Sequence, residues 1–161
     1  MRSRRLIKSL GLIVTALAIA AYAGRHTAPT ARQAYYVKWV ADGDTIQLEN
    51  GRFVRYIGID TPETEHSYRP AGYYGKEAYL YNKRLVEGKR VRLEFDMERI
   101  DKYDRLLAYV YVDDIFVNAK LVEDGYARTL TIPPNVKYAD LFLRLERGAR
   151  KSRRGLWGGR P

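Results

Sequence analysis

The sequence contains no cysteine and only two histidines among its 161 residues. Without cysteine, neither a disulfide framework nor a thiolate metal site is possible, so a folded domain must be held together by packing alone. The two histidines, His26 and His66, have no apparent partner for a metal site. We expect both to be solvated surface groups. The absence of cysteine does not decide the cellular compartment.

Acidic residues are outnumbered in this chain, with 19 Asp and Glu against 29 Lys and Arg, which gives a formal net charge of +10. A basic surface attracts polyanions such as nucleic acids, although many basic proteins only carry solvated Lys and Arg side chains. The sequence has no internal repeat or low-complexity tract, and 46% of its residues are hydrophobic. Its length and composition therefore predict one globular domain with a real core.

The N-terminal segment has the layout of a secretory signal peptide. Four basic side chains in the first eight residues precede an uncharged stretch from Ser9 to Gly24, and Ala21-Tyr22-Ala23 suits a cleavage site. The run from Leu10 to Ala23 is short for a membrane span, which needs about 20 apolar residues. We expect residues 1–23 to export the chain to a secreted, periplasmic or cell-surface location. The alternative is an uncleaved anchor formed by residues 6–23; in either case the segment makes at least transient membrane contact.

Residues 24–34 are predicted to form a linker, residues 35–157 the folded domain, and residues 158–161 a short tail. The domain begins with signals for three consecutive strands, which alternate with turn sequences. These strands are expected at Tyr35–Val40, Thr45–Leu48 and Phe53–Ile59.

The second half of the domain mixes helix and strand patterns. Apolar residues recur at helical spacing between Tyr74 and Glu87, and Gly88 stands where a helix would end. Further strands are expected at Arg90–Phe95, Leu106–Val112 and Ile115–Val117, a short helix at Asn118–Asp124, and a last helix with Leu141, Phe142, Leu145 and Ala149 on its apolar face. The fold class is therefore α+β. The order is three strands, a helix, two or three further strands and two helices, which suits a five-stranded OB-fold β-barrel with about three helices, preceded by the export segment.

Two aspartates are candidate ligands for a cation. Asp44 follows a glycine turn, and Asp60 ends the third expected strand. If the strands around Asn50-Gly51 pair, these carboxylates lie near the same edge of the sheet. Two carboxylates with backbone carbonyls and water suit a hard cation such as Ca²⁺ or Mg²⁺. Taken alone, however, each aspartate is an ordinary turn or loop residue.

Two arginines and a glutamate complete the candidate constellation. Arg55 lies on the expected strand between the two aspartates, and Arg105 directly precedes another strand. A planar guanidinium donates two hydrogen bonds to a phosphate and keeps its charge, although a single arginine more often forms a surface ion pair. Glu63 lies on the loop beyond Asp60, where a carboxylate could accept a proton from water. The alternative for Glu63 is an exposed surface residue.

Several longer motifs resemble the staphylococcal-nuclease-like (thermonuclease) family, and they appear in the right order from about Tyr35 to Trp157. Several motifs in order form a far more specific signal than any one of them. The matching stretches are Val40–Thr45, Arg55–Glu63, Tyr74–Ala78, Asp101–Tyr109, Val117-Asn118 and Gly155–Trp157.

The resemblance implies an OB-fold barrel with three helices and Ca²⁺-dependent hydrolysis of DNA and RNA. We expect the protein to be a monomer. By position it assigns Asp44 and Asp60 as carboxylate ligands of Ca²⁺ and Thr61 as a carbonyl ligand, with Asp42 as a nearby acidic group. The resemblance also assigns the scissile phosphate to Arg55 and Arg105, the attacking water to Glu63, and a substrate phosphate to Lys102 and Tyr103.

One departure from the family pattern concerns base stacking, because the family's nucleotide-stacking tyrosine falls near Thr131 in this chain. Loss of that ring would remove about 1–3 kcal/mol of stacking energy.

Two other functions are alternatives to a nuclease: a non-catalytic nucleic-acid-binding OB-fold module, either tethered or secreted, and a membrane-tethered adhesion domain. The first predicts decayed acidic or arginine positions, and these are intact. The second predicts no such constellation.

Overall fold

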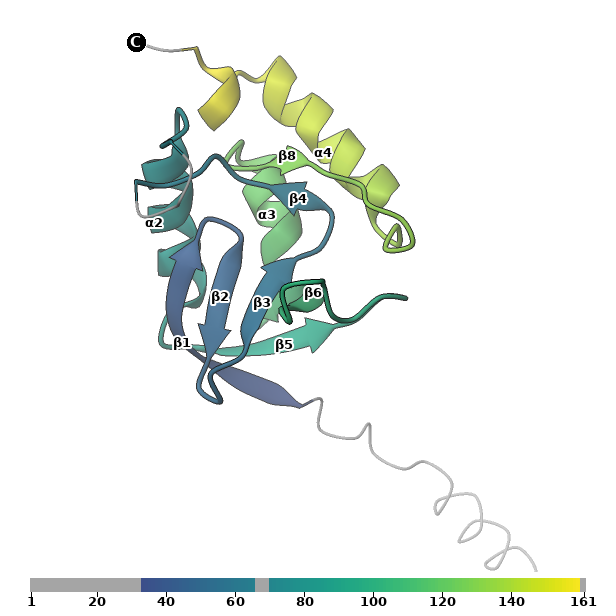
Figure 1. The fold of residues 1–161 in the computed structure, drawn as a ribbon. Helices are drawn as coiled ribbons and strands as arrows, with labels where there is room; N and C mark the ends of the chain where they lie inside the picture. The colour runs from purple at the N-terminus through teal and green to yellow at the C-terminus, as the bar shows by residue number, and fades with distance from the viewer. Residues whose placement is uncertain (1–32, 66–69, 160–161) are drawn as a thin grey trace, which may run out of the picture. The chain divides into compact units, whose positions relative to one another are not determined.

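Five strands close into a barrel in the computed structural model of the chain, which describes residues 33–65 and 70–159 (Figure 1). Strand β1 pairs antiparallel with β2 and β5, β2 pairs antiparallel with β3, and β5 pairs antiparallel with β6. A parallel pairing of β3 with β6 closes the ring. The barrel strands are β1 (Ala34–Asp42), β2 (Thr45–Leu48), β3 (Phe53–Tyr56), β5 (Arg90–Glu94) and β6 (Leu106–Val112). The predicted five-stranded OB-fold barrel is therefore confirmed.

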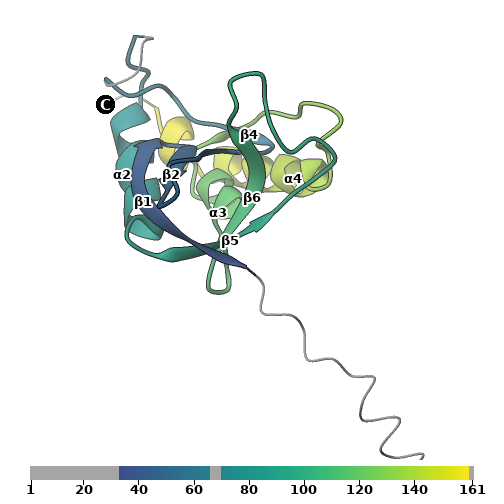
Figure 2. The ribbon, with the colours of Figure 1, turned by 60° about the horizontal axis from the view of Figure 1, so that its bottom comes forward.

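Three α-helices accompany the barrel in the described part of the chain: α2 (Gly75–Val86), α3 (Val117–Glu123) and α4 (Ala139–Lys151). Helix α2 packs against β1, whereas α3 contacts both β6 and α4 (Figure 2). A short 3-10 helix, η1 (Gly155–Trp157), follows α4, and Leu156 is buried there. The predicted α+β class and the helix count are thus confirmed.

The predicted hairpin and short helix in the second half of the domain also form. Strand β7 (Ile115–Phe116) pairs with the end of β6, and Asp113 in the turn has φ 50°. Val117, expected at the end of that hairpin, instead begins α3. Its side chain is fully buried in the core.

The third predicted strand, Phe53–Ile59, is wrong in its extent. Strand β3 ends at Tyr56, and the chain turns at Ile57-Gly58 before β4 (Ile59–Asp60) begins. Gly58 has φ +80°, and a β-carbon there would lie 2.5 Å from the ring of Phe142. Only glycine combines this backbone conformation with such a close approach. After the turn, β4 leaves the barrel and pairs antiparallel with β8 (Arg128–Thr129), a strand that the sequence did not predict.

The last helix buries a charged residue that its apolar pattern did not indicate. Phe142 and Ala149 are buried as expected, and Glu146 between them is also buried. The Glu146 carboxylate accepts hydrogen bonds from the backbone N–H and hydroxyl of Thr129 and from the guanidinium of Arg150. These bonds fasten β8 to α4.

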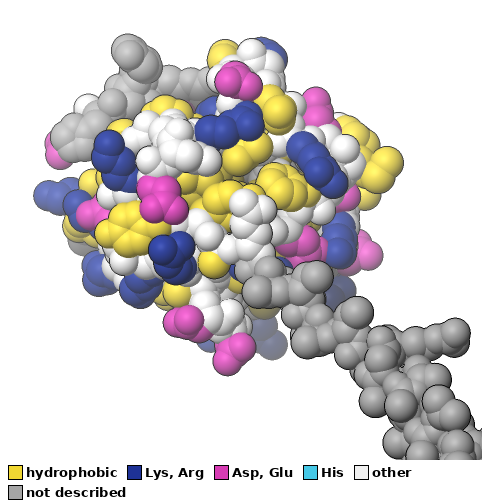
Figure 3. All heavy atoms as spheres, turned by 90° about the horizontal axis from the view of Figure 1, so that it is seen from below, with side chains coloured by type: hydrophobic (Ala, Val, Ile, Leu, Met, Phe, Trp, Pro, Cys, Tyr) yellow, Lys and Arg dark blue, Asp and Glu magenta, His cyan; other side chains and the backbone are white. Residues whose placement is uncertain are grey.

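The predicted export segment, residues 1–23, most of the linker, and both histidines lie outside the described residues. Strand β1 starts at Ala34, the last residue assigned to the linker. Within the described segments, none of the helices has the length and apolar character needed to cross a membrane. Lys and Arg side chains are spread around the face shown in Figure 3 and are interspersed with acidic and apolar side chains.

Candidate active site

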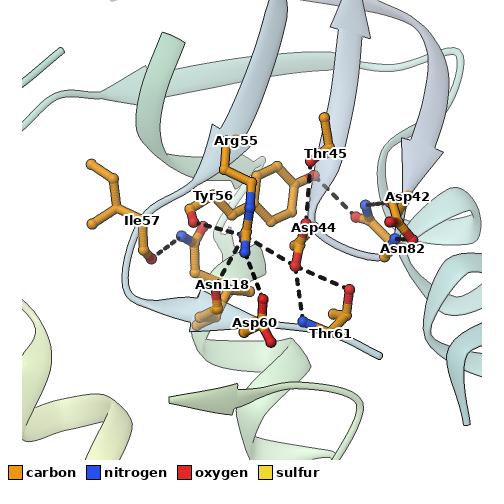
Figure 4. A network of polar contacts seen from close by, with 12 residues as sticks. Asp42, Asp44, Thr45, Arg55, Tyr56, Ile57, Asp60, Thr61, Asn82 and Asn118 are labelled. Atoms are coloured by element: carbon orange, nitrogen blue, oxygen red, sulfur yellow. Dashed lines mark hydrogen bonds and ion pairs between the residues drawn. The ribbon is translucent and has the colours of Figure 1, made fainter. Parts of the chain in front are cut away.

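Asp44, Arg55 and Asp60 meet at one end of the barrel (Figure 4). The strand pairing explains how, because Arg55 on β3 is directly opposite Thr45 on β2, next to Asp44. The Arg55 guanidinium lies 3.0 Å from the Asp44 carboxylate and 2.9 Å from that of Asp60. It also donates hydrogen bonds to the backbone oxygens of Tyr56 and Ile59. The structure thus brings the two predicted carboxylates together through Arg55.

Thr61 fixes the orientation of the Asp44 carboxylate. Its backbone N–H and its hydroxyl both donate to Oδ2 of Asp44, at 2.8 and 3.0 Å. The hydroxyl of Thr45 donates to Oδ1 at 3.2 Å. Asp44 and Thr61 are both buried, whereas about half of the Asp60 side chain is exposed. One carboxylate is therefore held rigidly inside the site while the other faces solvent.

The site carries more negative charge than Arg55 offsets. Burial, together with the nearby carboxylates of Asp44 and Glu63, raises the pKa of Asp42 to about 6. Burial and the same two carboxylates also raise the pKa of Asp60, although Arg55 opposes the shift. Asp42 lies beside the cluster, as predicted, and its carboxylate accepts a hydrogen bond from the N–H of Gly43. Carboxylates that raise one another's pKa values in this way form a negatively charged environment, which is suited to a cation.

Glu63 is positioned through its backbone by the start of α2. Its carbonyl oxygen accepts a hydrogen bond from the N–H of Gly72 at 2.9 Å. A β-carbon on Gly75, the first residue of α2, would lie only 2.1 Å from the same oxygen. Any side chain at Gly75 would therefore displace Glu63 or the helix. The absence of a side chain at position 75 lets the Glu63 segment pack directly against α2.

Arg105 and Arg55 line the same hollow, which has a volume of about 300 Å³. Arg55 lies on β3 and Arg105 directly precedes β6, and these two strands pair where the barrel closes. Asp101 orients Arg105, because its Oδ2 accepts a hydrogen bond from Nε and forms an ion pair with Nη2, both at 2.7 Å. Lys102 and Tyr103 line the same hollow, and Tyr103 is 68% exposed. Both cationic side chains lie against the Tyr103 ring, at 5.0 Å for Lys102 and 5.4 Å for Arg105. The four predicted phosphate-contacting residues therefore gather around one opening.

Part of the wall of this hollow is aliphatic. Leu130 and Ile132 line it, whereas Thr131 between them does not. None of residues 130–132 is aromatic, and the loss of base stacking near Thr131 stays a prediction. Leu130 and Ile132 could not be recognised from the sequence, because neither carries a chemical group that would distinguish it from a core residue.

Two buried asparagines form hydrogen bonds to the segments that carry the site residues. Asn118 accepts a hydrogen bond from the N–H of Val110 and donates to the carbonyl of Ile57, both at 2.9 Å. It thereby pins the turn that separates Arg55 from Asp60 (Figure 4). Asn82 on α2 similarly accepts a hydrogen bond from Tyr56 on β3. Val117-Asn118 was one of the matching motifs, but the sequence alone gave it no role.

The donor set at this end of the barrel fits a hard cation in chemistry. Asp44 and Asp60 have carboxylate oxygens, which are ligands that Ca²⁺ and Mg²⁺ accept together with backbone carbonyls and water, and the predicted carbonyl ligand, Thr61, is hydrogen-bonded to Asp44 through its N–H and hydroxyl. Within residues 33–65 and 70–159, no three His, Cys, Asp or Glu side chains are arranged to hold a metal by themselves. Such a site would therefore depend on carbonyl and water ligands as well as on the two aspartates.

Comparison with known proteins adds an independent observation. Residues 53–159 match the family model described as staphylococcal nuclease homologue, a span that includes Arg55, Asp60, Glu63 and Arg105. The chain is 43% identical to a thermonuclease of Staphylococcus intermedius over 128 residues, which cover 78% of this chain and 76% of that protein. It is 39% identical to a thermonuclease of Staphylococcus hyicus over the same shares. Identity with the endonuclease YncB of Bacillus subtilis (strain 168) is 44% over 72% of this chain and 57% of that protein.

Proposed function

Since this chain belongs to the family of staphylococcal nuclease homologues, we infer that it is a nuclease, a hydrolase that cleaves phosphodiester bonds in nucleic acids. The observation that carries this conclusion is the position of Arg55. It contacts both Asp44 and Asp60 and also lines the hollow that contains Arg105. One side chain therefore links an acidic, cation-binding surface to a phosphate-binding one.

We further propose that hydrolysis depends on Ca²⁺ and proceeds within DNA and RNA strands. Asp44 and Asp60 would hold the ion through their carboxylates, and Thr61 would hold it through its carbonyl. The bound ion would neutralise charge on the phosphate and help to orient it. Support comes from the oxygen-only donor set and from the raised pKa of Asp60, which burial and the neighbouring carboxylates cause.

Arg55 and Arg105 are proposed to bind the nonbridging oxygens of the scissile phosphate. Charge develops on these oxygens as the phosphorus is attacked, and preorganised donors stabilise it. Asp101 holds the Arg105 fork from one side, so that among the described residues Nη1 of Arg105 has no hydrogen-bond partner. This N–H group remains available to a substrate.

Glu63 is proposed to accept the proton of the attacking water. The water oxygen forms the new bond to phosphorus, the bond to the leaving oxygen breaks, and that oxygen takes a proton from solvent. Lys102 and Tyr103 at the mouth of the hollow are proposed to contact a neighbouring substrate phosphate. The exposed Tyr103 ring, flanked by two cations, supports this role.

Export of the nuclease is a further proposal that depends on the sequence of residues 1–23 alone. The segment would act as a cleaved signal peptide or as an anchor formed by residues 6–23, in transient or lasting contact with the membrane. We propose that the exported protein is a monomer. Fractionation of the source cells, followed by N-terminal sequencing of the mature chain, tests export and cleavage together.

The metal requirement is tested by assaying the full chain on single-stranded DNA, double-stranded DNA and RNA. Each substrate is incubated with Ca²⁺, with Mg²⁺ and with the chelator EGTA. We expect hydrolysis in Ca²⁺ that is abolished by EGTA and restored by excess Ca²⁺. Hydrolysis that continues unchanged in EGTA would contradict the Ca²⁺ assignment, and an absence of hydrolysis under every condition would contradict the nuclease assignment itself.

A further inference from the structure

Arg128 lies directly across the two-stranded β4–β8 sheet from Asp60. Residues directly opposite each other in an antiparallel pair project to the same side of the sheet. Arg128 therefore projects from the same face as the exposed carboxylate of Asp60. Among the described residues, Arg128 forms neither a close ion pair nor a side-chain hydrogen bond, and the direct partner of Asp60 is Arg55. The charge of Arg128 still acts on Asp60 through space, because it opposes the rise in the pKa of that carboxyl.

An aromatic ring also lies close to the guanidinium of Arg128. Its guanidinium lies 5.7 Å from the ring centre of Trp157, on the short helix η1. Arg150 contacts the same ring more closely, at 3.7 Å, and is itself bound to Glu146. A cation over an aromatic face keeps its N–H donors available for another partner. The Arg128 side chain therefore lies against a ring and near a carboxylate, but no described residue accepts a hydrogen bond from it.

A second hollow, of about 350 Å³, opens beside this arginine. It is lined by Asp60, Pro62, Gly72, Tyr73 and Arg128. Arg55, which binds Asp60, lines the first hollow and not the second. The two hollows are therefore adjacent to the Arg55–Asp60 pair but have different walls. The first holds Lys102 and Tyr103, and the second holds Arg128 and Tyr73.

A nuclease that cleaves within a strand needs room for nucleotides on both sides of the scissile bond. The second hollow has the size of a small-molecule site. It also combines an arginine, which binds phosphate through a planar fork, with a tyrosine ring, which can pack against a sugar or a base. This combination is typical of single-stranded nucleic-acid binding.

We propose that this second hollow is a nucleotide subsite of the same active centre. Arg128 binds a phosphate of the strand on the side of the scissile bond opposite to Lys102 and Tyr103, and Tyr73 packs against the adjoining nucleoside. The inference rests on the proposed nuclease function. It assigns Arg128 to substrate binding, a role that its position in the sequence did not indicate.

Substrates that differ in how far they extend test the subsite. The first is a short single-stranded oligodeoxynucleotide, which has nucleotides on both sides of the bond that is cleaved. The others are the 3′- and 5′-(p-nitrophenyl phosphates) of thymidine, which have a nucleoside on one side only. For the faster of these two esters, Arg128→Gln is expected to change kcat/KM less than about twofold. For the oligonucleotide, the same substitution is expected to lower kcat/KM by about tenfold, as the loss of one phosphate contact predicts.

Two further variants control for charge and folding. Arg90→Gln removes the same charge from an exposed arginine on β5 that lines neither hollow, and it is expected to leave both substrates unaffected. Arg128→Lys keeps the charge and is expected to restore part of the lost oligonucleotide activity. If Arg128→Gln slows both substrates equally, the arginine acts through Asp60 rather than on the strand. If Arg128→Gln and Arg90→Gln have the same effect on both substrates, Arg128 has no specific role in substrate binding. Either result overturns the proposal.

A binding measurement separates this inference from the proposed function. Fluorescence anisotropy of a labelled oligonucleotide in EDTA gives the affinity of the full chain without hydrolysis. Because each phosphate contact to a single strand contributes a slope of about 0.7 to the dependence of log K on log salt, Arg128→Gln is expected to reduce the slope by about that amount. A chain that does not hydrolyse nucleic acid but shows this change would contradict the nuclease function and keep the subsite. An unchanged slope in a chain that hydrolyses nucleic acid would contradict the subsite and keep the nuclease function.

Discussion

Arg55 and Asp44 form an ion pair of 3.0 Å that is nearly closed to solvent, with 15% and 7% of the two side chains exposed. Thr61 donates two hydrogen bonds to the same carboxylate oxygen. Such a pair is not in itself a large source of stability, but removing one partner leaves the other charge buried and uncompensated. Arg55 therefore has a structural duty in the free protein and a proposed catalytic one with substrate.

Arg55→Gln is predicted to lower both stability and activity. The free energy of unfolding should fall by about 3 kcal/mol, because Asp44 loses its only ion-pair partner among the described residues. Hydrolysis should fall at least about 100-fold, as for the loss of a preorganised donor to the transition state. Urea unfolding and steady-state kinetics measure the two effects. Arg52→Gln is the control: its ion pair with Asp104 is exposed and 3.5 Å long, so a change below about 0.5 kcal/mol is expected.

The close approach of Gly75 to Glu63 makes a second prediction. In Gly75→Ala the new β-carbon would collide with the Glu63 carbonyl, so the loop that carries Glu63 must shift. A misplacement of about 1 Å near reacting groups can cost up to about 100-fold in rate, and we expect kcat to fall by about 10- to 100-fold with a smaller change in KM. Kinetics on the purified variant measure both constants.

Gly148→Ala provides the matched control for that substitution. Gly148 lies within α4, and a β-carbon there would meet no atom within 4 Å. Alanine favours a helix over glycine by about 0.5–1 kcal/mol, so this variant should be slightly more stable and fully active. A Gly75→Ala enzyme that also retains full activity would show that the position of Glu63 is unimportant for hydrolysis.

The buried carboxylate of Glu146 predicts part of the acid sensitivity of the fold. Burial by itself would raise the pKa of Glu146, but hydrogen bonds from Thr129 and Arg150 outweigh burial and lower it below the ordinary value of 4.5. A carboxyl whose pKa is lowered on folding stabilises the fold fully above its unfolded pKa. That stabilisation is lost as the pH falls through the folded value. The wild-type chain should therefore lose stability progressively below about pH 4.5.

Glu146→Gln tests this assignment by urea unfolding across a pH series. The variant should be less stable than the wild type at pH 7, and the difference should shrink as the pH falls below 4.5. Glu49→Gln, at an exposed position, should follow the wild-type curve. A constant difference at every pH would mean that the carboxylate charge of Glu146 does not contribute.

The aliphatic wall of the first hollow predicts a gain of affinity. Leu130 lines this wall and is 40% exposed, so Leu130→Tyr would place a ring where the family's stacking tyrosine is missing. One base stacked on an aromatic ring contributes about 1–3 kcal/mol, and a KM about tenfold lower for an oligonucleotide is expected. Leu143→Tyr, at a similarly exposed position on α4, should leave KM unchanged. Equal KM values for both variants would show that bases do not bind against Leu130.

Regular elements with strong local signals could be predicted from sequence. The turn at Asp42-Gly43-Asp44 separates β1 from β2, and Gly88 lies just beyond α2, as the sequence predicts. Local backbone requirements determine both positions. Strand β8, in contrast, has two residues and exists only because β4 leaves the barrel to pair with it. Such a short strand has no periodicity of its own, so the sequence could not reveal it.

The candidate site shows the same division between local and long-range information. Asp44, Arg55 and Asp60 lie close together in the chain, and the hairpin between them is enough to suggest their contact. Arg128 reaches the site only through the β4–β8 pairing. Its charge does not distinguish it from the other Lys and Arg residues, of which the sequence has 29 in all. Glu146 was missed because helical periodicity registers apolar residues, whereas burial of this carboxylate depends on partners from β8.

The most direct test of the proposed active centre is the Asp44→Asn variant, assayed for hydrolysis of an oligonucleotide over a range of Ca²⁺ concentrations. Asparagine retains an oxygen that can accept the hydrogen bonds from Thr61 but removes the charge that would hold the cation. We predict a folded protein whose activity is reduced at least about 100-fold and whose remaining activity requires more Ca²⁺. Full activity with an unchanged Ca²⁺ requirement would contradict the account.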